Sequence, residues 1–284
     1  MRRSTNKILT THVGALPGPL ETWEGKAGEA ALRSAVREVV SAQLAAGIDV
    51  VNEGELTKGG NWVTFINSRL SGFVGVPAEG TAALLRSSAD WKEFDDFYAK
   101  ALAGGTLFEQ TASTPVQTSG IRDWVCREPI RYTGQQALSR EIELLKSTLG
   151  AQPVGDAFLT STAPASIEVG RRNEYYKSDE EYIEANARAL KTEYKAITDA
   201  GFILQIDTPV MKYNALSLTV EDFRKRFGRL MELYNDVLAD IPEEQIRLHI
   251  CYGGMRAPHS GDIHLDQYAD ILVKALSDSL ASLS

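Results

Sequence analysis

The stretch Ser178–Pro209, SDEEYIEANARALKTEYKAITDAGFILQIDTP, decides the fold class. Its first part predicts a helix, because Ser178 and Glu181 have the spacing of a capping box and apolar residues recur every three or four positions. Gly201 is suited to end that helix. The apolar run Phe202–Asp207 follows at once and is typical of a buried strand. A long helix that leads directly into a short buried strand is the building unit of parallel α/β sheets.

The same alternation extends in both directions from this stretch. Long amphipathic patterns at about 29–46 and 220–239 predict two further helices. Five other short runs have the composition of strands: Ile8–Gly14, Ile48–Asn52, Trp124–Ile130, Ala157–Ser161 and Ile246–Cys251. The chain is therefore predicted to form a parallel sheet of βα units, either open or closed into a barrel.

About 70 residues separate the second predicted strand from the third, which is far more than one helical crossover needs. Residues 72–120 are therefore predicted to be an insertion between these strands. It could act as a lid or as a contact between chains, and it could equally be a structural excursion without a chemical role.

The composition excludes several classes of protein. The 284 residues are 43% hydrophobic and 24% charged, as in ordinary globular enzymes, and the formal net charge is −8. An acidic chain without a dense lysine and arginine cluster is not expected to bind nucleic acid. No apolar run approaches the roughly 20 residues that cross a membrane. Two cysteines cannot build a disulfide framework, so a cytoplasmic location is expected.

Polar side chains gather where the predicted strands end. His12 and Gly14 close the first strand, Asn52 and Glu55 follow the second, and Asp207 ends the strand of the opening stretch. The carboxyl ends of parallel strands form the active-site face in α/β proteins. The pattern favours an enzyme, although Asp207 and Glu55 could simply serve turns and His12 could be a structural hydrogen-bonding residue.

His249 and Cys251 end the last predicted strand and are two positions apart, so their side chains point to the same face. Imidazole and thiolate are preferred zinc ligands, which makes this pair a candidate zinc site. The alternative is a buried cysteine that packs as a small apolar residue, beside a histidine that is merely hydrogen-bonded. The common fingerprints of dinucleotide, P-loop, hydrolase and zincin sites are absent from the sequence.

Five segments resemble the cobalamin-independent methionine synthase family, in particular its short, single-barrel branch that includes epoxyalkane:coenzyme M transferase. They are Leu9–Pro17, Gly47–Glu55, Arg172–Tyr176, Leu204–Pro209 and Arg247–Gly253. The likeness covers essentially the whole chain in the family's order. It implies a single (β/α)8 barrel of the TIM type over residues 1–284.

The resemblance also implies a function. It is the zinc-dependent transfer of a methyl or alkyl group to a small-molecule thiol, with a thiolate as the nucleophile. His249 and Cys251 would bind zinc, whereas Glu55 and Asp207 would hold the amino group of a homocysteine-like thiol. Gly14 and Asn52 would line the same site, and His12 would join Glu55 and Asp207 as a catalytic residue. The donor would be a methylated folate or another alkyl compound, and a homo-oligomer is compatible with the sequence.

The chain also departs from the family. The first loop continues Ala15-Leu16-Pro17-Gly18 where relatives commonly have Ser-Leu-Pro-Arg, and Glu128 replaces a glycine. The family completes its metal site with a cysteine, and often a glutamate, from its last two strands. The sequence has no cysteine after Cys251, and only six strands are predicted, so the last one or two barrel strands are expected to be missing.

Two further readings stay open at this point. One is a truncated family member that has lost its metal site and its catalysis. The other is a metal-free barrel lyase or decarboxylase, in which His12, Glu55 and Asp207 act without Cys251.

Overall fold

The computed structural model describes residues 5–23, 25–59, 62–76, 89–104, 123–150, 156–168, 171–209, 218–251 and 257–274. Within these ranges, no helix is long and apolar enough to cross a membrane.

A parallel sheet forms the centre of the molecule, with strands in the order β1-β4-β6-β7. Its strands are β1 (Val50–Val51), β4 (Asp156–Thr162), β6 (Ile203–Pro209) and β7 (Ile246–Cys251). The main helices on its outer side are α2 (Glu29–Ala45), α7 (Gln135–Leu149), α8 (Asp179–Asp199) and α10 (Val220–Leu238). The α/β class predicted from the sequence is confirmed.

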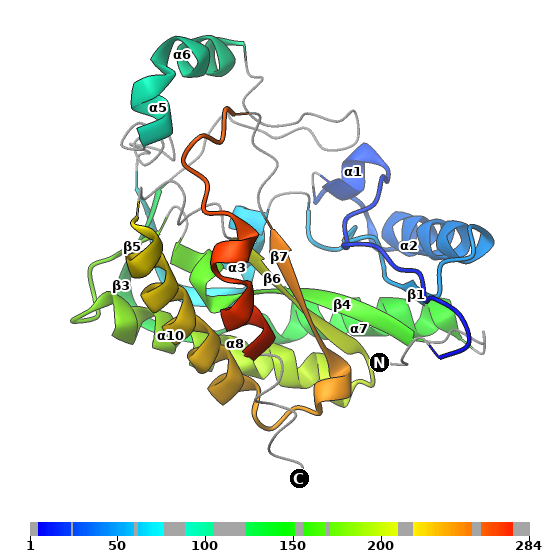
Figure 1. Cartoon of the computed structure of the whole chain (residues 1–284). Coiled ribbons are helices and arrows are strands. Elements are labelled where there is room, and N and C mark those ends of the chain that lie inside the picture. Colours follow the sequence, from blue (N-terminus) through cyan, green and yellow to red (C-terminus); the bar gives the residue numbers. More distant parts are fainter. Residues whose placement is uncertain are drawn as a thin grey trace.

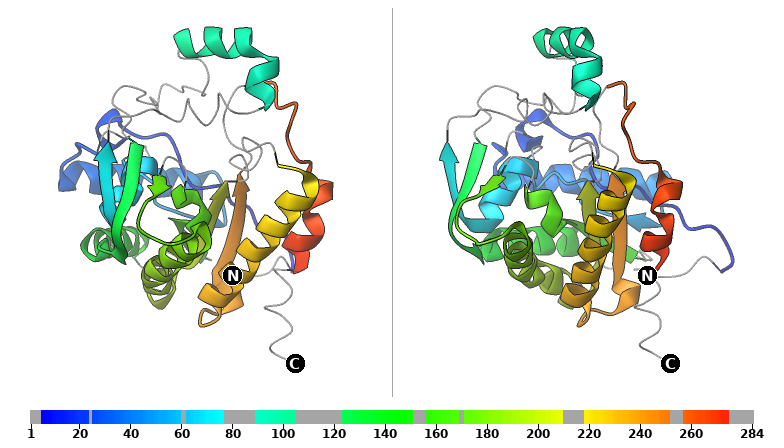
Figure 2. Two further views of the ribbon diagram at one scale, coloured as in Figure 1. Left: turned by 90° about the vertical axis from the view of Figure 1, so that its left-hand side faces the viewer. Right: turned by 60° about the vertical axis from the view of Figure 1, so that its left-hand side comes forward.

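The sheet is curled into a half-barrel, which the two rotated views show (Figure 2). Residues 8–14, expected to be the first strand, are not assigned as a strand but lie beside β1. The carbonyl oxygen of Thr10 accepts hydrogen bonds of 3.1 Å from the backbone N–H groups of Asp49 and Val50. A closed eight-stranded barrel is not seen among the residues that the structure describes.

The third predicted strand, Trp124–Ile130, was expected in the parallel sheet, and this prediction was wrong. It belongs to β3 (Asp123–Tyr132), which pairs antiparallel with β2 (Leu70–Val76) and parallel with β5 (Arg171–Asn173) in a separate three-stranded sheet. The prediction failed because β2 is rich in glycine and does not look like a strand. Gly72, at φ +99°, lies at an irregularity in the pairing, where a side chain would press on the Glu128 carbonyl.

The predicted insertion, residues 72–120, begins inside β2, because 72–76 belong to that strand. Its described part contains α5 (Ala89–Glu93) and α6 (Asp95–Ala103), whereas 77–88 and 105–122 lie outside the described residues. These helices stand apart from the sheet and meet the segment near Ser260, whose N–H donates to Asp90 at 2.9 Å. A role as lid or chain contact stays a prediction.

The remaining elements are short. They are α1 (Leu20–Trp23), α3 (Trp62–Arg69) and the 3-10 turns Pro164–Glu168, Glu243–Gln245 and Leu265–Gln267. The predicted boundaries of α8 are confirmed: the Ser178 hydroxyl accepts from the Glu181 N–H, and Gly201 follows the helix at φ +89°.

The two faces of the curled sheet contribute to different apolar clusters. Leu159, Leu204 and Ile206 face the helices and join the large apolar core. Phe158 and Ile203, with Val50, form a small separate cluster inside the curl. Because side chains alternate along a strand, the residues two and four positions after Phe158 and Ile203 also point into the curl.

Candidate functional site

Strand register places the polar strand-end residues in rows on the inner face of the half-barrel. Thr160, Gln205 and Arg247 are neighbours across β4, β6 and β7. In the next row toward the carboxyl ends, Asp207 lies beside His249, and Cys251 is one step beyond. The strand ends therefore bring Asp207, His249 and Cys251 to neighbouring positions, and their role as site residues stays a prediction.

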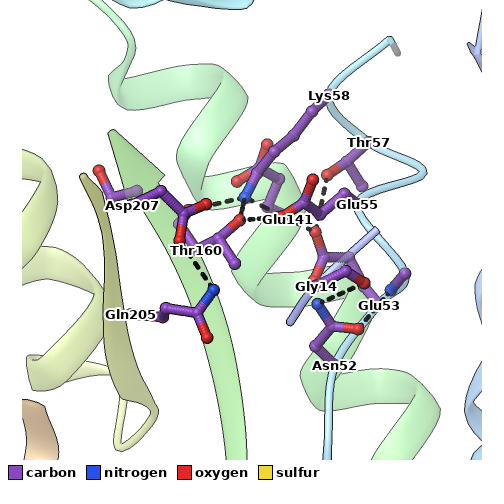
Figure 3. Close-up of polar contacts among 12 residues, drawn as sticks. Gly14, Asn52, Glu53, Glu55, Thr57, Lys58, Glu141, Thr160, Gln205 and Asp207 are labelled. Carbon is purple, nitrogen blue, oxygen red and sulfur yellow. Dashed lines mark hydrogen bonds and ion pairs between the residues drawn. The ribbon is translucent and has the colours of Figure 1, made fainter. Parts of the chain in front are cut away.

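Glu55 reaches this face from the turn after β1 (Figure 3). It follows Gly54 and, like it, has a positive φ, at +56°. A left-handed conformation costs a non-glycine residue about 1 kcal/mol or more, and such strain is typical of functional sites. The Thr160 hydroxyl donates a hydrogen bond of 2.7 Å to Glu55 Oε1. This hydrogen bond holds Glu55 against β4. A residue that only closed a turn would not require such a contact.

Asp207 faces the same space from β6, and the Gln205 amide donates to its Oδ1 at 2.8 Å. Burial, followed by the negative charge of Glu55, raises the pKa of Asp207 to about 7. The negative charge of Glu55 thus disfavours the charged form of Asp207, which a cation near both side chains would relieve.

Gly14 lies directly against Glu55. Its φ of +146° is a conformation that side chains rarely adopt, and an added Cβ would collide with Glu55 Oε1. The buried Asn52 holds this turn, because its amide donates to the Gly14 carbonyl at 3.2 Å and its Oδ1 accepts from the Gly54 N–H at 2.8 Å. Asn52 therefore acts through Gly14 and Gly54, with its side chain hydrogen-bonded to the backbone of both.

Gly14→Ala is expected to lower the free energy of unfolding by about 2 kcal/mol, because it adds backbone strain and displaces the Glu55 carboxylate. Gly228→Ala is the matched control, since Gly228 lies inside α10 with nothing near its added Cβ, and it should stabilise the chain by about 0.5–1 kcal/mol. Urea unfolding measures both. Equal effects of the two substitutions would contradict the close approach.

His12 uses both ring nitrogens within this turn. Its Nε2 lies 2.7 Å from Gln43 Oε1, and its Nδ1 accepts from the Gly14 N–H at 3.2 Å. Burial lowers the pKa of His12, so the ring is neutral at pH 7. These contacts support a structural part for His12 in holding Gly14.

A buried ionic layer lies behind Glu55. The Lys58 ammonium donates to the Thr160 hydroxyl and, at 2.6 Å, to the Thr160 carbonyl, and it lies 3.9 Å from Glu53. Glu53 is fully buried, and its Oε2 has no hydrogen-bond partner among the described residues. Burial raises the pKa of Glu53 to about 7, against the opposing effect of Lys58. Neither residue was singled out by the sequence, where they are two charges within a turn.

Glu53→Gln is expected to flatten the dependence of stability on pH. Because its pKa rises from 4.5 to about 7 on folding, the folded chain keeps a proton that the unfolded chain releases. The free energy of unfolding should therefore fall as the pH rises through this window, by at most about 3 kcal/mol. The variant should lack the part of the fall that comes from Glu53 and keep the part that comes from Asp207, whose pKa is also raised to about 7. It should be the more stable protein above about pH 7. Urea unfolding between about pH 5 and 8 tests this, and parallel curves for both proteins would contradict it.

A second ionic group lies deeper, between the two sheets. Arg69, 2% exposed, donates to Glu141 at 2.5 Å and lies 3.8 Å from Glu193. Glu193 also accepts hydrogen bonds from Tyr132 at 2.7 Å and Ser161 at 2.6 Å. This group ties α8 to the outer side of β4 and to β3, so it supports the strand that carries Thr160.

His249 and Cys251 are both half-buried at the end of β7. Burial lowers the pKa of His249, so its ring is neutral, which is the form that binds metals. No third histidine, cysteine, aspartate or glutamate joins them in a metal-holding group within the described ranges. The pair has suitable donor chemistry but supplies only two of the three or four ligands that zinc takes from proteins.

Arg247 is a further site residue that the sequence interpretation missed, after Glu53 and Lys58. Its guanidinium donates to Gln205 Oε1 at 2.7 Å, to the Thr11 hydroxyl at 2.9 Å and to the His12 carbonyl at 2.6 Å, and it lies 3.8 Å above the Phe158 ring. It thus joins β7 to the N-terminal segment across the inside of the curl. The signal was available: Arg247 precedes His249 by two positions and therefore shares its face.

Fold and site together define an α/β half-barrel with a cluster of acidic side chains, a candidate ligand site, at the carboxyl ends of its parallel strands. No protein-family model matches the chain. In sequence it is similar to proteins named methionine synthase. Those of Saccharolobus solfataricus and Sulfolobus acidocaldarius are each 26% identical in an alignment of length 274 that covers 92% of this chain and 68% and 66% of theirs.

In fold the chain is similar to a B12-independent methionine synthase from Shewanella sp. in complex with selenomethionine (TM-score 0.57, 20% identity, 87% of this chain and 63% of the other). A putative B12-independent methionine synthase from Listeria monocytogenes gives a TM-score of 0.53 at 18% identity, over 88% of this chain and 68% of the other. The resemblance to the cobalamin-independent methionine synthases is thus confirmed. The sequence relatives carry the name of an enzyme. The chain spans about two thirds of the length of these proteins.

Proposed function

We propose that the chain is a methyltransferase that binds homocysteine and carries a methyl group to its thiol. The observation that carries the proposal is the carboxylate pair Glu55 and Asp207, brought together from the turn after β1 and from β6. The names of the sequence relatives support the reaction.

An ammonium group fits this pair physically. Each carboxylate already accepts one hydrogen bond from a neutral side chain, from Thr160 or from Gln205, and keeps further acceptor positions. An amino acid that places its ammonium between Glu55 and Asp207 would make charge-assisted hydrogen bonds and remove their mutual repulsion. The amino group of homocysteine is of this kind, and its thiol lies on the other end of a short chain.

His249, which lies beside Asp207, and Cys251, one row beyond, are the residues that would hold zinc. Zinc, when bound, would favour the deprotonated form of a thiol, which is the nucleophilic form. Among the described residues, these two are the only members of the candidate metal group. Within the proposal, Glu55 and Asp207 orient the substrate, Gly14 leaves room for Glu55, and Asn52 and His12 hold Gly14.

Several finer predictions belong to this proposal. They are the closed (β/α)8 barrel, a methylated folate as methyl donor, alkyl groups or coenzyme M-like thiols as variants of the reaction, a cytoplasmic location, and a homo-oligomer. One alternative is a truncated family member without catalysis, which is compatible with the two-residue group of His249 and Cys251 among the described residues. The metal-free lyase gains no such support, because both nitrogens of His12 are engaged in the Gly14 turn.

Zinc binding and thiol methylation in three proteins test the proposal: the wild type, Cys251→Ala and Cys126→Ala. Cys126 is the matched control, since it is buried in β3 and its thiol donates to the Glu128 carbonyl. We expect the wild type and Cys126→Ala to bind zinc and to form methionine from homocysteine and a methylated folate, and Cys251→Ala to lose both. If the wild type takes up no zinc and forms no methionine, the non-catalytic alternative replaces the proposal.

A further inference from the structure

Each carboxylate of the proposed substrate site is connected to a partly buried cation, Lys58 or Arg247, through one neutral side chain. On one side, Lys58 donates to the hydroxyl of Thr160, and that hydroxyl donates to Glu55 (Figure 3). On the other side, Arg247 donates to Gln205 Oε1, and the Gln205 amide donates to Asp207. The two bridging residues are register neighbours on β4 and β6.

The direction of these hydrogen bonds follows from the chemistry of the cations. Lysine and arginine can only donate, so Thr160 and Gln205 must accept from them with an oxygen. The single hydroxyl proton of Thr160 is then left for Glu55, and the amide group of Gln205 is turned toward Asp207. The second amide proton of Gln205 goes to the Val13 carbonyl at 2.5 Å, which fixes that amide further.

A neutral bridge has an advantage over a direct ion pair. A lysine in contact with Glu55 would occupy the carboxylate and compete with the ammonium of the substrate. Through a hydroxyl or an amide, the cation orients the carboxylate and leaves its charge available. The arrangement therefore suits a site that must bind a positive group repeatedly and release it.

We propose that Lys58 with Thr160, and Arg247 with Gln205, are positioning residues that aim the two carboxylates at the amino group of the substrate. This inference rests on the proposed function. It assigns selectivity for the amino group to residues that do not touch the substrate. The bridging hydroxyl of Thr160 is its most direct test, because valine has the same shape without the hydroxyl.

Calorimetric titration with two ligands separates positioning from structure. The ligands are homocysteine and 4-sulfanylbutanoate, which has the same thiol and carboxylate but lacks the amino group. We expect Thr160→Val to weaken homocysteine binding about tenfold, a loss of one charge-assisted hydrogen bond, and to leave 4-sulfanylbutanoate binding unchanged. Thr160→Ser, which keeps the hydroxyl, should restore most of the affinity.

Thr208→Val is the matched control. Thr208 is buried on β6, and its hydroxyl has no hydrogen-bond partner among the described residues. Removing that hydroxyl should change the affinity for neither ligand. A double variant completes the test: Thr160→Val should add nothing in a Glu55→Gly background if Thr160 acts through Glu55.

The outcomes distinguish the two proposals. If the wild type binds both ligands equally, the substrate site itself is wrong and the positioning role falls with it. If the wild type prefers homocysteine but Thr160→Val keeps that preference, or weakens both ligands alike, only the positioning role is overturned. Selective loss of homocysteine binding, rescued by serine and absent in the Glu55→Gly background, supports it.

Discussion

Asp207→Asn is expected to weaken homocysteine binding about a hundredfold, the largest effect of any single substitution at the site. Asparagine keeps the size of the side chain and can still bond to Gln205, so the change removes mainly the charge that faces the ammonium. Truncating or neutralising one partner of a buried, hydrogen-bonded charge pair costs about 2–5 kcal/mol. Titration calorimetry measures the dissociation constant, and the affinity for 4-sulfanylbutanoate should rise or stay unchanged.

Asp199→Asn is the control for this substitution. Asp199 lies on the surface at the end of α8, where it pairs with Lys195 at 3.1 Å, and surface pairs contribute about 0–1 kcal/mol. It should leave homocysteine binding unchanged. An Asp207→Asn protein that binds homocysteine as tightly as the wild type would remove the observation on which the proposed function rests.

Arg69→Met should have the largest effect on stability, lowering the free energy of unfolding by about 3–5 kcal/mol. The substitution keeps an apolar stem but leaves Glu141 and Glu193 buried without their cation, and an uncompensated buried charge is costly. The loss is measured by urea unfolding, with the slope of the transition checked for an unchanged exposed surface.

Arg33→Met is the matched control, because Arg33 forms an exposed pair with Glu29 four residues earlier on α2. Its removal should cost less than about 0.5 kcal/mol. A loss below about 1 kcal/mol in Arg69→Met would show that the buried carboxylates find other partners or take up protons, and that the ionic group of Arg69, Glu141 and Glu193 does not support β4.

Parts of the fold followed from local pattern alone. The helix before β6 was predicted with its capping residue and its final glycine, because these signals depend only on neighbours in the chain. β4, β6 and β7 were predicted because a buried parallel strand is a short apolar run in any context. β2 was missed, since its partner β3 is about 50 residues away and its glycines are explained only by that pairing.

The candidate site also has features that local pattern predicts and features that it does not. Two-residue spacing on one strand is local, so the pairing of His249 with Cys251 on one face could be predicted from the sequence. The pairing of Thr160 with Glu55, or of Arg247 with His12, joins residues 105 and 235 positions apart, and no local pattern encodes it. Asn52 shows the difference well, since its position beside Gly14 was expected and its buried, backbone-holding contacts were not.

The sequence by itself determined the α/β class, the polar strand ends and the resemblance to cobalamin-independent methionine synthases, because each depends on short-range pattern. Only the tertiary structure decided that Trp124–Ile130 lies outside the parallel sheet and that Glu55 and Asp207 face one another. It also placed Lys58 and Arg247 where Thr160 and Gln205 connect them to the two carboxylates. The physical reason is that strand register and burial are properties of the whole packed chain, and the energies of buried charges depend on neighbours that folding alone brings together.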